Sequence, residues 1–187
     1  MTAAGIISGE SGADDTLEHR LARVQLLLLD CDGVLTGGGV GWSNDGIESK
    51  TFHIRDGLGI RLWQRAGHAT GIVTGRSSRV VQVRAEELGM AVVRQGVADK
   101  QSVVAEILAE RGLTWEQTAF VGDDLPDLAC VMRCGVGVAV ADACVEVRAA
   151  AALVTGLPGG GGAVREVVER LLRARGQWEA IVAGYAA

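Results

Sequence analysis

The stretch 24-VQLLLLDCDGVLT-36 joins a short apolar run to two carboxylates and a glycine. Val24–Leu29 has the length and composition of a strand that is buried on both faces of a sheet. Side chains alternate along extended chain, so the Asp30 and Asp32 carboxylates point to the same side where the chain leaves the sheet. Gly33 allows a tight turn and a close approach to a ligand. Two neighbouring carboxylates repel each other without a cation, and Mg²⁺, which prefers oxygen ligands, suits this position.

This D-x-D-G motif alone has two other interpretations, an ordinary turn and a calcium-binding loop. The run of four leucines before Asp30 disfavours the turn. A calcium loop of the EF-hand type needs further ligands and a terminal Glu at fixed positions, and Gly33 and Val34 do not supply that pattern.

Further short apolar runs alternate with helical patterns along the chain, which predicts an α/β fold with a doubly wound (Rossmann-like) parallel sheet. Ligands of such sheets lie beyond the carboxyl ends of the strands, so polar residues there are candidate site residues. The other expected strands are Ala69–Val73, Ala91–Val93, Ala119–Val121 and, as short candidates, Val136–Val140 and Ala152–Val154. The expected helices run from a capping residue to a glycine: Asp56 to Gly67, Ser77 or Ser78 to Gly89, and Asp99 to Gly112.

One segment, Thr36–Arg55, interrupts this alternation. It is rich in glycine and contains the turn signal Asn44-Asp45-Gly46, which predicts a β-hairpin. The hairpin follows the first strand directly, so it is a candidate flap over the site, and no room remains for a separate cap domain. Residues 21–187 are expected to form a single domain, and residues 1–20 a flexible N-terminal arm.

The composition excludes several classes of partner. A net charge of −5 and a pI near 5.2 provide no basic surface for nucleic acid or for an acidic membrane. No apolar run approaches the ~20 residues of a membrane span, and the N-terminus lacks the pattern of a secretory signal. The four cysteines show no metal-site spacing, so reduced thiols in a cytoplasmic protein are expected.

Polar residues at the ends of two later elements extend the candidate site. Thr74 and Gly75 follow the second strand, where a hydroxyl and an N–H can hold phosphoryl oxygens, although a capping turn explains Thr74 equally well. Lys100 follows Asp99 at a helix start, where the helix dipole disfavours a cation. That position suggests pairing with phosphate or with Asp30, and the alternative is a solvated surface lysine.

The segment Gly122-Asp123-Asp124-Leu125-Pro126-Asp127 forms the second strong signal. Capping of a helix start explains Asp124 and Asp127, with Pro126 in the first turn. It does not explain Asp123, which is an additional carboxylate directly at a strand end. Asp123 is therefore the better candidate for a metal ligand, and Asp124 and Asp127 are expected to orient Lys100 or a metal-bound water.

The four elements together resemble the haloacid dehalogenase phosphatase family in both their order and their strand-end placement. A D-x-D-G-[VT]-x-T motif, a Thr before Gly, a Lys at a helix start and G-D-D-x-x-D are the motifs of that family. The segments Lys50–Ile60 and Gly159–Glu166 further resemble its capless branch, typified by 3-deoxy-D-manno-octulosonate 8-phosphate phosphatases of lipopolysaccharide biosynthesis. Gly161 departs from that branch, whose members commonly carry a larger, often basic, residue there.

The resemblance implies roles for particular residues. Asp30 would attack phosphorus to form an aspartyl-phosphate, and Asp32 would protonate the leaving oxygen and then activate water. It implies a Mg²⁺ ion on Asp30, Asp123 and the backbone carbonyl of Asp32. The phosphoryl group would be held by Thr74, Gly75 and Lys100, and the remaining substrate-binding residues would be Thr36, Arg55 and Arg76, with the two arginines facing a sugar-acid carboxylate.

The resemblance also implies a homotetramer in which the hairpin of one subunit and the C-terminal tail of another, residues 176–187, help to close each site. The expected substrate is a small sugar-acid phosphate, 3-deoxy-D-manno-octulosonate 8-phosphate, with nonulosonate 9-phosphates as the alternative. A receiver-type signalling domain and a non-catalytic scaffold are the alternatives from other classes. No G-x-x-x-x-G-K-[ST] motif occurs, which disfavours a nucleoside triphosphatase.

Overall fold

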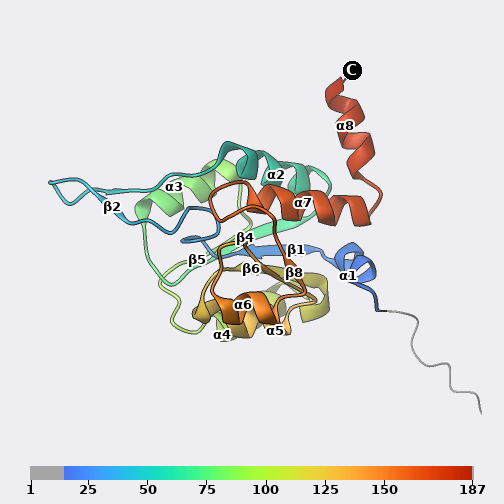
Figure 1. The fold of residues 1–187 in the computed structure, drawn as a ribbon, viewed down its shortest axis with the longest axis horizontal. Coiled ribbons are helices and arrows are strands. Elements are labelled where there is room, and N and C mark those ends of the chain that lie inside the picture. The colour runs from blue at the N-terminus through green and yellow to red at the C-terminus, as the bar shows by residue number, and fades with distance from the viewer. Residues whose placement is uncertain (1–14, 187) are drawn as a thin grey trace, which may run out of the picture.

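The computed structural model describes residues 15–186 and contains one parallel sheet between two layers of helices (Figure 1). The strand order β5-β4-β1-β6-β7-β8 confirms the doubly wound α/β fold. The expected arm lies outside the described residues as far as residue 14, and its last residues belong to helix α1. The strands are β1 (Leu26–Leu29), β4 (Ala69–Val73), β5 (Val92–Arg94), β6 (Thr118–Gly122), β7 (Val136–Ala139) and β8 (Leu153–Val154).

The register of the central strands sets the position of the site. Leu29 at the end of β1 pairs with Ile72 of β4 on one side and with Val121 of β6 on the other. The carboxyl ends of these three strands therefore lie level with one another, and the residues that follow them meet at one edge. All four leucines of β1 have no exposed surface, as the apolar run predicts for a strand covered on both faces.

Helices cover both faces of the sheet. On one side α2 packs against α7 and α3, and on the other side lie α4, α5 and α6 (Figure 1). None of the helices in the described residues is long and apolar enough to cross a membrane. The helices are α1 (Leu17–Arg23), α2 (Ile54–Arg65), α3 (Arg79–Leu88), α4 (Lys100–Arg111), α5 (Leu128–Arg133), α6 (Val145–Ala150), α7 (Ala163–Ala174) and α8 (Trp178–Ala186), with 3₁₀ turns at Trp115–Gln117 and Leu125–Asp127.

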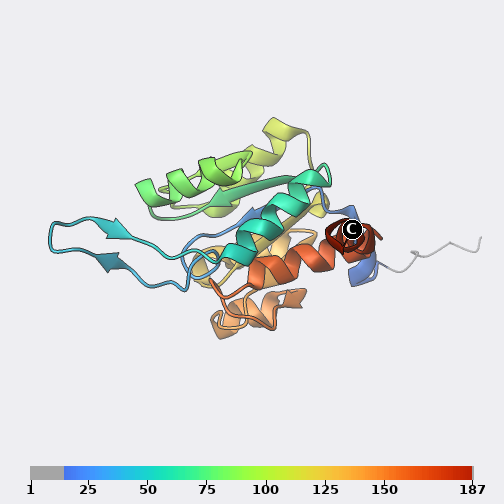
Figure 2. The ribbon, with the colours of Figure 1, turned by 90° about the horizontal axis from the view of Figure 1, so that it is seen from above.

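The expected hairpin is present but has short strands. β2 (Gly41–Trp42) and β3 (Glu48–Ser49) pair in antiparallel fashion, and Gly46 adopts the left-handed conformation (φ 73°) that the turn requires. Figure 2 shows the hairpin projecting from one end of the molecule, while α8 lies at the other end. Within residues 15–186 no separate cap domain accompanies it.

Two of the three helices start at the expected residues: Ser78 precedes α3, although its side chain makes no capping hydrogen bond, and Asp99 precedes α4. Asp99 caps α4, since its side chain accepts a hydrogen bond from the Ser102 N–H (3.2 Å). Asp56 does not cap α2, which begins two residues earlier at Ile54. Its Oδ1 instead accepts a hydrogen bond from the Arg165 N–H (2.8 Å) in the first turn of α7. The expectation for Asp56 was wrong because the side chain serves a helix that is distant in sequence.

Candidate active site

The strand ends bring seven of the expected site residues to a single pocket of about 350 Å³. Asp30 follows β1, Thr74 follows β4 and Asp123 follows β6, while Lys100 opens the helix after β5. These side chains lie together because the carboxyl ends of the parallel strands lie at the same level of the sheet. The expected residues that line the pocket are Asp30, Asp32, Thr74, Gly75, Arg76, Lys100 and Asp123.

Lys100 is a buried partner of two carboxylates. Its Nζ donates hydrogen bonds to Asp30 Oδ1 (2.6 Å) and to Asp127 Oδ1 (2.6 Å), and only 4% of its side chain is exposed. Burial lowers the pKa of Lys100, but the two carboxylates outweigh burial and leave the pKa raised. The alternative of a solvated surface lysine is therefore excluded, and Lys100 orients Asp30.

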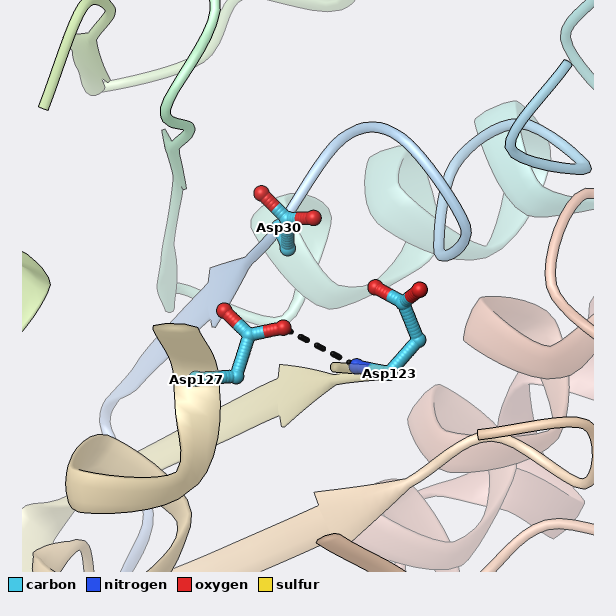
Figure 3. Close-up of side chains that lie close together, drawn as sticks. All are labelled: Asp30, Asp123 and Asp127. Carbon is cyan, nitrogen blue, oxygen red and sulfur yellow. Dashed lines mark hydrogen bonds between the residues drawn. The ribbon is translucent and has the colours of Figure 1, made fainter. Parts of the chain in front are cut away.

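Asp127 supports the turn after β6 and the position of Lys100 together. Its Oδ2 accepts hydrogen bonds from the Asp123 N–H (3.0 Å) and the Asp124 N–H (3.3 Å), the first of which is drawn in Figure 3. Asp124 in turn caps the 3₁₀ turn by accepting from the Leu125 N–H (2.8 Å). Both Asp127 oxygens therefore have partners within the protein, in keeping with the supporting role expected of it.

Asp30 and Asp123 form the centre of an acidic cluster that lacks sufficient positive charge. Carboxylate oxygens of Asp30, Asp123 and Asp127 lie within 4.8 Å of one another. Burial, then the charges of Asp30 and Asp127, raise the pKa of Asp123 to about 7. Burial and the charge of Asp127 raise the pKa of Asp30 to about 6, against the opposing effect of Lys100.

A divalent cation fits this cluster. Oδ1 of Asp123 is buried and has no hydrogen-bond partner, and in Figure 3 the Asp30 and Asp123 side chains rise from neighbouring strand ends on the same side. An unpartnered carboxylate oxygen beside a second carboxylate is a donor set that hard cations such as Mg²⁺ prefer. The residues present therefore suit the Mg²⁺ ion that the sequence predicts.

Asp32 has basic partners that the sequence analysis did not identify. The Lys50 Nζ donates a hydrogen bond to Asp32 Oδ1, and the Arg76 Nε lies 3.5 Å from Asp32 Oδ2. Lys50 comes from the base of the hairpin, directly after β3. One signal was available: Lys50 and Lys100 are the only lysines among the 18 Lys and Arg residues of the chain.

Two of the expected substrate-binding residues lie outside this pocket. The Thr36 hydroxyl donates to the Cys31 carbonyl (3.4 Å) and accepts from the Gly38 N–H (3.3 Å), so it stabilises the loop after β1. Arg55 is exposed at the start of α2 and lines a separate cleft with Arg165 and Glu169. A single subunit does not bring either side chain to Asp30.

The glycine run Gly159–Gly162 packs on the backbone of the D-x-D-G turn. The Gly160 N–H donates to the Val34 carbonyl (2.9 Å), and a Cβ on Gly159 would lie 1.6 Å from the Gly33 carbonyl oxygen. Only glycine allows this approach, so the run supports the turn that carries Asp30 and Asp32.

Comparisons with known proteins agree with this geometry. The sequence model of the haloacid dehalogenase-like hydrolases matches residues 89–165. The 3-deoxy-D-manno-octulosonate 8-phosphate phosphatase of Haemophilus influenzae is 35% identical over 161 residues, which cover 86% of this chain and 89% of the relative. The Yersinia pestis phosphatase of the same name is 40% identical over 167 residues, which cover 89% of each chain.

Solved structures match over a similar span. The Moraxella catarrhalis 3-deoxy-D-manno-octulosonate 8-phosphate phosphatase, solved with a magnesium ion, a phosphate ion and KDO, has a TM-score of 0.89 and 36% identity, and the match covers 90% of this chain and 97% of that one. A probable phosphatase of the YrbI family from Pseudomonas syringae has a TM-score of 0.90 and 43% identity, with coverage of 91% and 97%.

The fold, the acidic strand-end site and these matches define a haloacid dehalogenase-like hydrolase. Within that class the chain belongs to the family of the 3-deoxy-D-manno-octulosonate 8-phosphate phosphatases. This membership overturns the alternative of a receiver-type signalling domain.

Proposed function

We propose that the protein hydrolyses 3-deoxy-D-manno-octulosonate 8-phosphate to the free sugar acid and phosphate, with Mg²⁺ as cofactor. The observation that carries this proposal is the cluster of Asp30, Asp123 and Lys100 at the ends of β1 and β6 and the start of α4. The Moraxella catarrhalis relative, with magnesium, phosphate and KDO bound, supports the choice of substrate and metal.

In the first step the Asp30 carboxylate attacks phosphorus, and the bond to the sugar oxygen breaks. Lys100 holds Asp30 Oδ1 at 2.6 Å, which fixes the orientation of the attacking carboxylate. Asp32 gives its proton to the departing sugar oxygen, so that an alcohol leaves rather than an alkoxide. Thr74, the Gly75 N–H and Lys100 line the pocket where the phosphoryl oxygens are held.

In the second step the Asp32 carboxylate takes a proton from water, and the resulting nucleophile attacks phosphorus of the aspartyl-phosphate. Asp30 is released as a carboxylate, and inorganic phosphate leaves. Asp30, Asp123 and the backbone carbonyl of Asp32 would hold the Mg²⁺ ion. When bound, the ion offsets the repulsion between carboxylate and phosphate and stabilises developing negative charge.

Arg76 is the arginine that supports recognition of the sugar-acid carboxylate within one subunit. It lines the pocket and 45% of its side chain is exposed, so it is open to a ligand. Arg55 would contribute only through an arrangement of several subunits, because it is exposed outside the pocket of its own chain, whereas the buried Thr36 would contribute by holding the loop after β1.

We further propose that the protein is a homotetramer whose hairpins take part in assembly. Val40, Trp42 and Ile47 on the hairpin are 47%, 60% and 66% exposed, which is unusual for large apolar side chains gathered on one projection. Contact with other subunits would bury them.

The cytoplasmic location expected from the sequence stays a prediction.

A phosphate-release panel tests the proposed function. The purified protein is assayed with Mg²⁺ on 3-deoxy-D-manno-octulosonate 8-phosphate, a nonulosonate 9-phosphate, and common hexose and pentose phosphates. We expect the highest kcat/KM on the eight-carbon substrate and loss of turnover in a metal chelator. A preference for the nine-carbon substrate would instead identify the protein as a nonulosonate 9-phosphate phosphatase. Turnover without metal would contradict the mechanism.

A further inference from the structure

Four charged side chains form a closed ring of alternating sign where the hairpin joins the body of the protein. Lys50 donates to Asp32 Oδ1 and lies 3.5 Å from Glu48 Oε1. Arg76 donates to Glu48 Oε1 (3.0 Å) and lies 3.5 Å from Asp32 Oδ2. Glu48 also accepts a hydrogen bond from the Ser78 hydroxyl at the start of α3. The ring thus joins β3 of the hairpin to the loop after β4 and to the D-x-D-G turn.

Lys50 is the most enclosed member of this ring. Its side chain has no exposed surface, whereas 19% of the Asp32 side chain remains exposed toward the pocket. Burial lowers the pKa of Lys50, but the hydrogen bond and charge of Asp32 outweigh burial and leave the pKa raised. A fully enclosed ammonium group is costly unless it is paired and hydrogen-bonded, so the contact with Asp32 is a stable feature of the fold.

The chain uses its two lysines in the same way. Lys100 donates to Asp30 and Lys50 donates to Asp32, so each carboxylate of the D-x-D pair has its own lysine. An ammonium group is compact and a guanidinium is not, so lysine can occupy a confined position beside a single carboxylate oxygen. If Lys50 only fixed the hairpin to the body of the protein, it would not need to contact Asp32, which takes part in the proposed reaction.

We propose that Lys50 is a positioning residue for proton transfer to the leaving sugar oxygen. This inference rests on the proposed function, because it concerns the role of Asp32 in that reaction. Lys50 on Oδ1 and Arg76 near Oδ2 restrict rotation of the Asp32 carboxylate. The hairpin therefore acts on the reaction of its own subunit through Lys50 and Glu48, in addition to any role in assembly.

The leaving group provides a test that a purely structural role would not satisfy. A sugar alkoxide departs slowly without a proton, whereas p-nitrophenolate departs readily without one. The value of kcat/KM reports the steps up to transfer of phosphate to Asp30, which excludes the later use of Asp32 as a base. For Lys50→Met we expect kcat/KM on the sugar phosphate to fall at least ~10-fold and that on p-nitrophenyl phosphate to fall less than ~3-fold.

Equal losses on the two substrates, or no loss on the sugar phosphate, would overturn the proposal. Arg148→Met, which changes an exposed cation on α6, is the matched control and should alter neither value. Glu48→Gln weakens the ring without leaving an enclosed ammonium unpaired. It should give a smaller loss with the same dependence on the leaving group, which preserves the test if Lys50→Met does not fold.

A double-mutant cycle with Asp32→Asn completes the test. When the proton donor is absent, positioning it has no effect, so Lys50→Met should cause no further loss on the sugar phosphate. A further loss as large as that in the wild-type background would contradict the proposal. If the wild-type protein did not hydrolyse the eight-carbon substrate, the proposed function would fail, and comparing any alkyl phosphate that it does hydrolyse with p-nitrophenyl phosphate would still test the role of Lys50.

Discussion

The two aspartates of the D-x-D motif lie two residues apart, yet different parts of the molecule hold them. Asp30 is buried at the sheet edge, where it accepts a hydrogen bond from Lys100, which also donates to Asp127. Asp32 is held at the base of a hairpin with two-residue strands, by Lys50 and by the half-exposed Arg76. The nucleophile therefore depends on the fold, and the acid–base residue depends on a projecting segment.

This difference implies different tolerance to change. The sheet-edge cluster is enclosed, so its charges interact strongly and removal of one leaves others unpaired. At the hairpin base Lys50 is enclosed, but 19% of the Asp32 side chain and 45% of the Arg76 side chain are exposed, so part of this ring is screened by solvent. Changes at the sheet edge should therefore have larger effects than changes at the hairpin.

The largest effect is expected for Asp30→Asn, which removes the nucleophile while keeping its shape. The variant should lose phosphate release by on the order of 1,000-fold or more, because no other carboxylate occupies its position. It should keep the fold, which circular dichroism and thermal melting would verify. Glu146→Gln, on the exposed surface of α6, is the matched control. Substantial turnover in Asp30→Asn would remove Asp30 from the reaction.

Lys100→Met is expected to have the second-largest effect. Removal of this positioned cation should lower kcat by ~10²- to 10³-fold. It also leaves Asp30 and Asp127 without their shared partner, so the free energy of unfolding should fall by up to about 3–5 kcal/mol without metal. Steady-state kinetics and denaturant unfolding measure the two effects. If Lys50→Met were as damaging as Lys100→Met on every substrate, the contrast between the two regions would be wrong.

A pH-dependent effect on stability is expected in a metal chelator. The pKa values of Asp30 (about 6) and Asp123 (about 7) lie above the ordinary value of 3.8, so the native state holds more protons than the unfolded chain between about pH 4 and pH 7. This contribution to stability is therefore lost as the pH rises through that range. Asp123→Asn removes the part of this pH dependence that comes from Asp123. The melting temperature of the variant should therefore rise relative to that of the wild type as the pH increases from about 4 to 7.

Saturating Mg²⁺ serves as the control for that experiment. The ion binds the ionised cluster of the native state, so it should raise the melting temperature of the wild type more at pH 7 than at pH 4. Asp123→Asn should show a smaller rise. If the melting temperatures of Asp123→Asn and the wild type differed by the same amount at every pH in chelator, the raised pKa of Asp123 would be contradicted. If Mg²⁺ raised both melting temperatures equally, the role of Asp123 as a metal ligand would be contradicted.

The smallest effect on chemistry is expected at the tip of the hairpin. Trp42→Ser replaces a 60% exposed indole, which makes no contribution to the core of its own subunit. We expect light scattering to show a shift from tetramer toward smaller species, and kcat to change less than in Lys50→Met. Arg55 would then be tested by asking whether the dissociated form loses affinity for the sugar acid.

The sequence was sufficient to predict the sheet-edge half of the site. Asp30, Thr74 and Asp123 each follow an apolar strand, and the carboxyl ends of parallel strands must meet at one edge. The misplaced cation Lys100 indicated its role through its conflict with the helix dipole. Local patterns and this topological rule placed the four residues at one edge of the sheet, and the resemblance to the haloacid dehalogenase phosphatases implied their roles.

The rest depended on contacts between distant segments. The position of Lys50 follows from how the hairpin folds back onto the turn after β1, which alternation and turn signals do not specify. Asp56 bonds to α7 across more than one hundred residues, so its local position at a helix start was misleading. Burial of Lys50 also could not be predicted, because a lysine at the end of a glycine-rich hairpin is usually solvated.

Identifying the residue that is phosphorylated during turnover tests the assignment of Asp30 as nucleophile most directly. The protein is mixed rapidly with 3-deoxy-D-manno-octulosonate 8-phosphate and Mg²⁺, quenched in acid, reduced with borohydride to convert any aspartyl-phosphate to homoserine, and analysed by mass spectrometry of its peptides. If Asp30 is the nucleophile, conversion occurs at Asp30 in the wild type and is absent in Asp30→Asn. Conversion at Asp32 or Asp123, or a burst of phosphate release with no modified aspartate, would contradict that assignment.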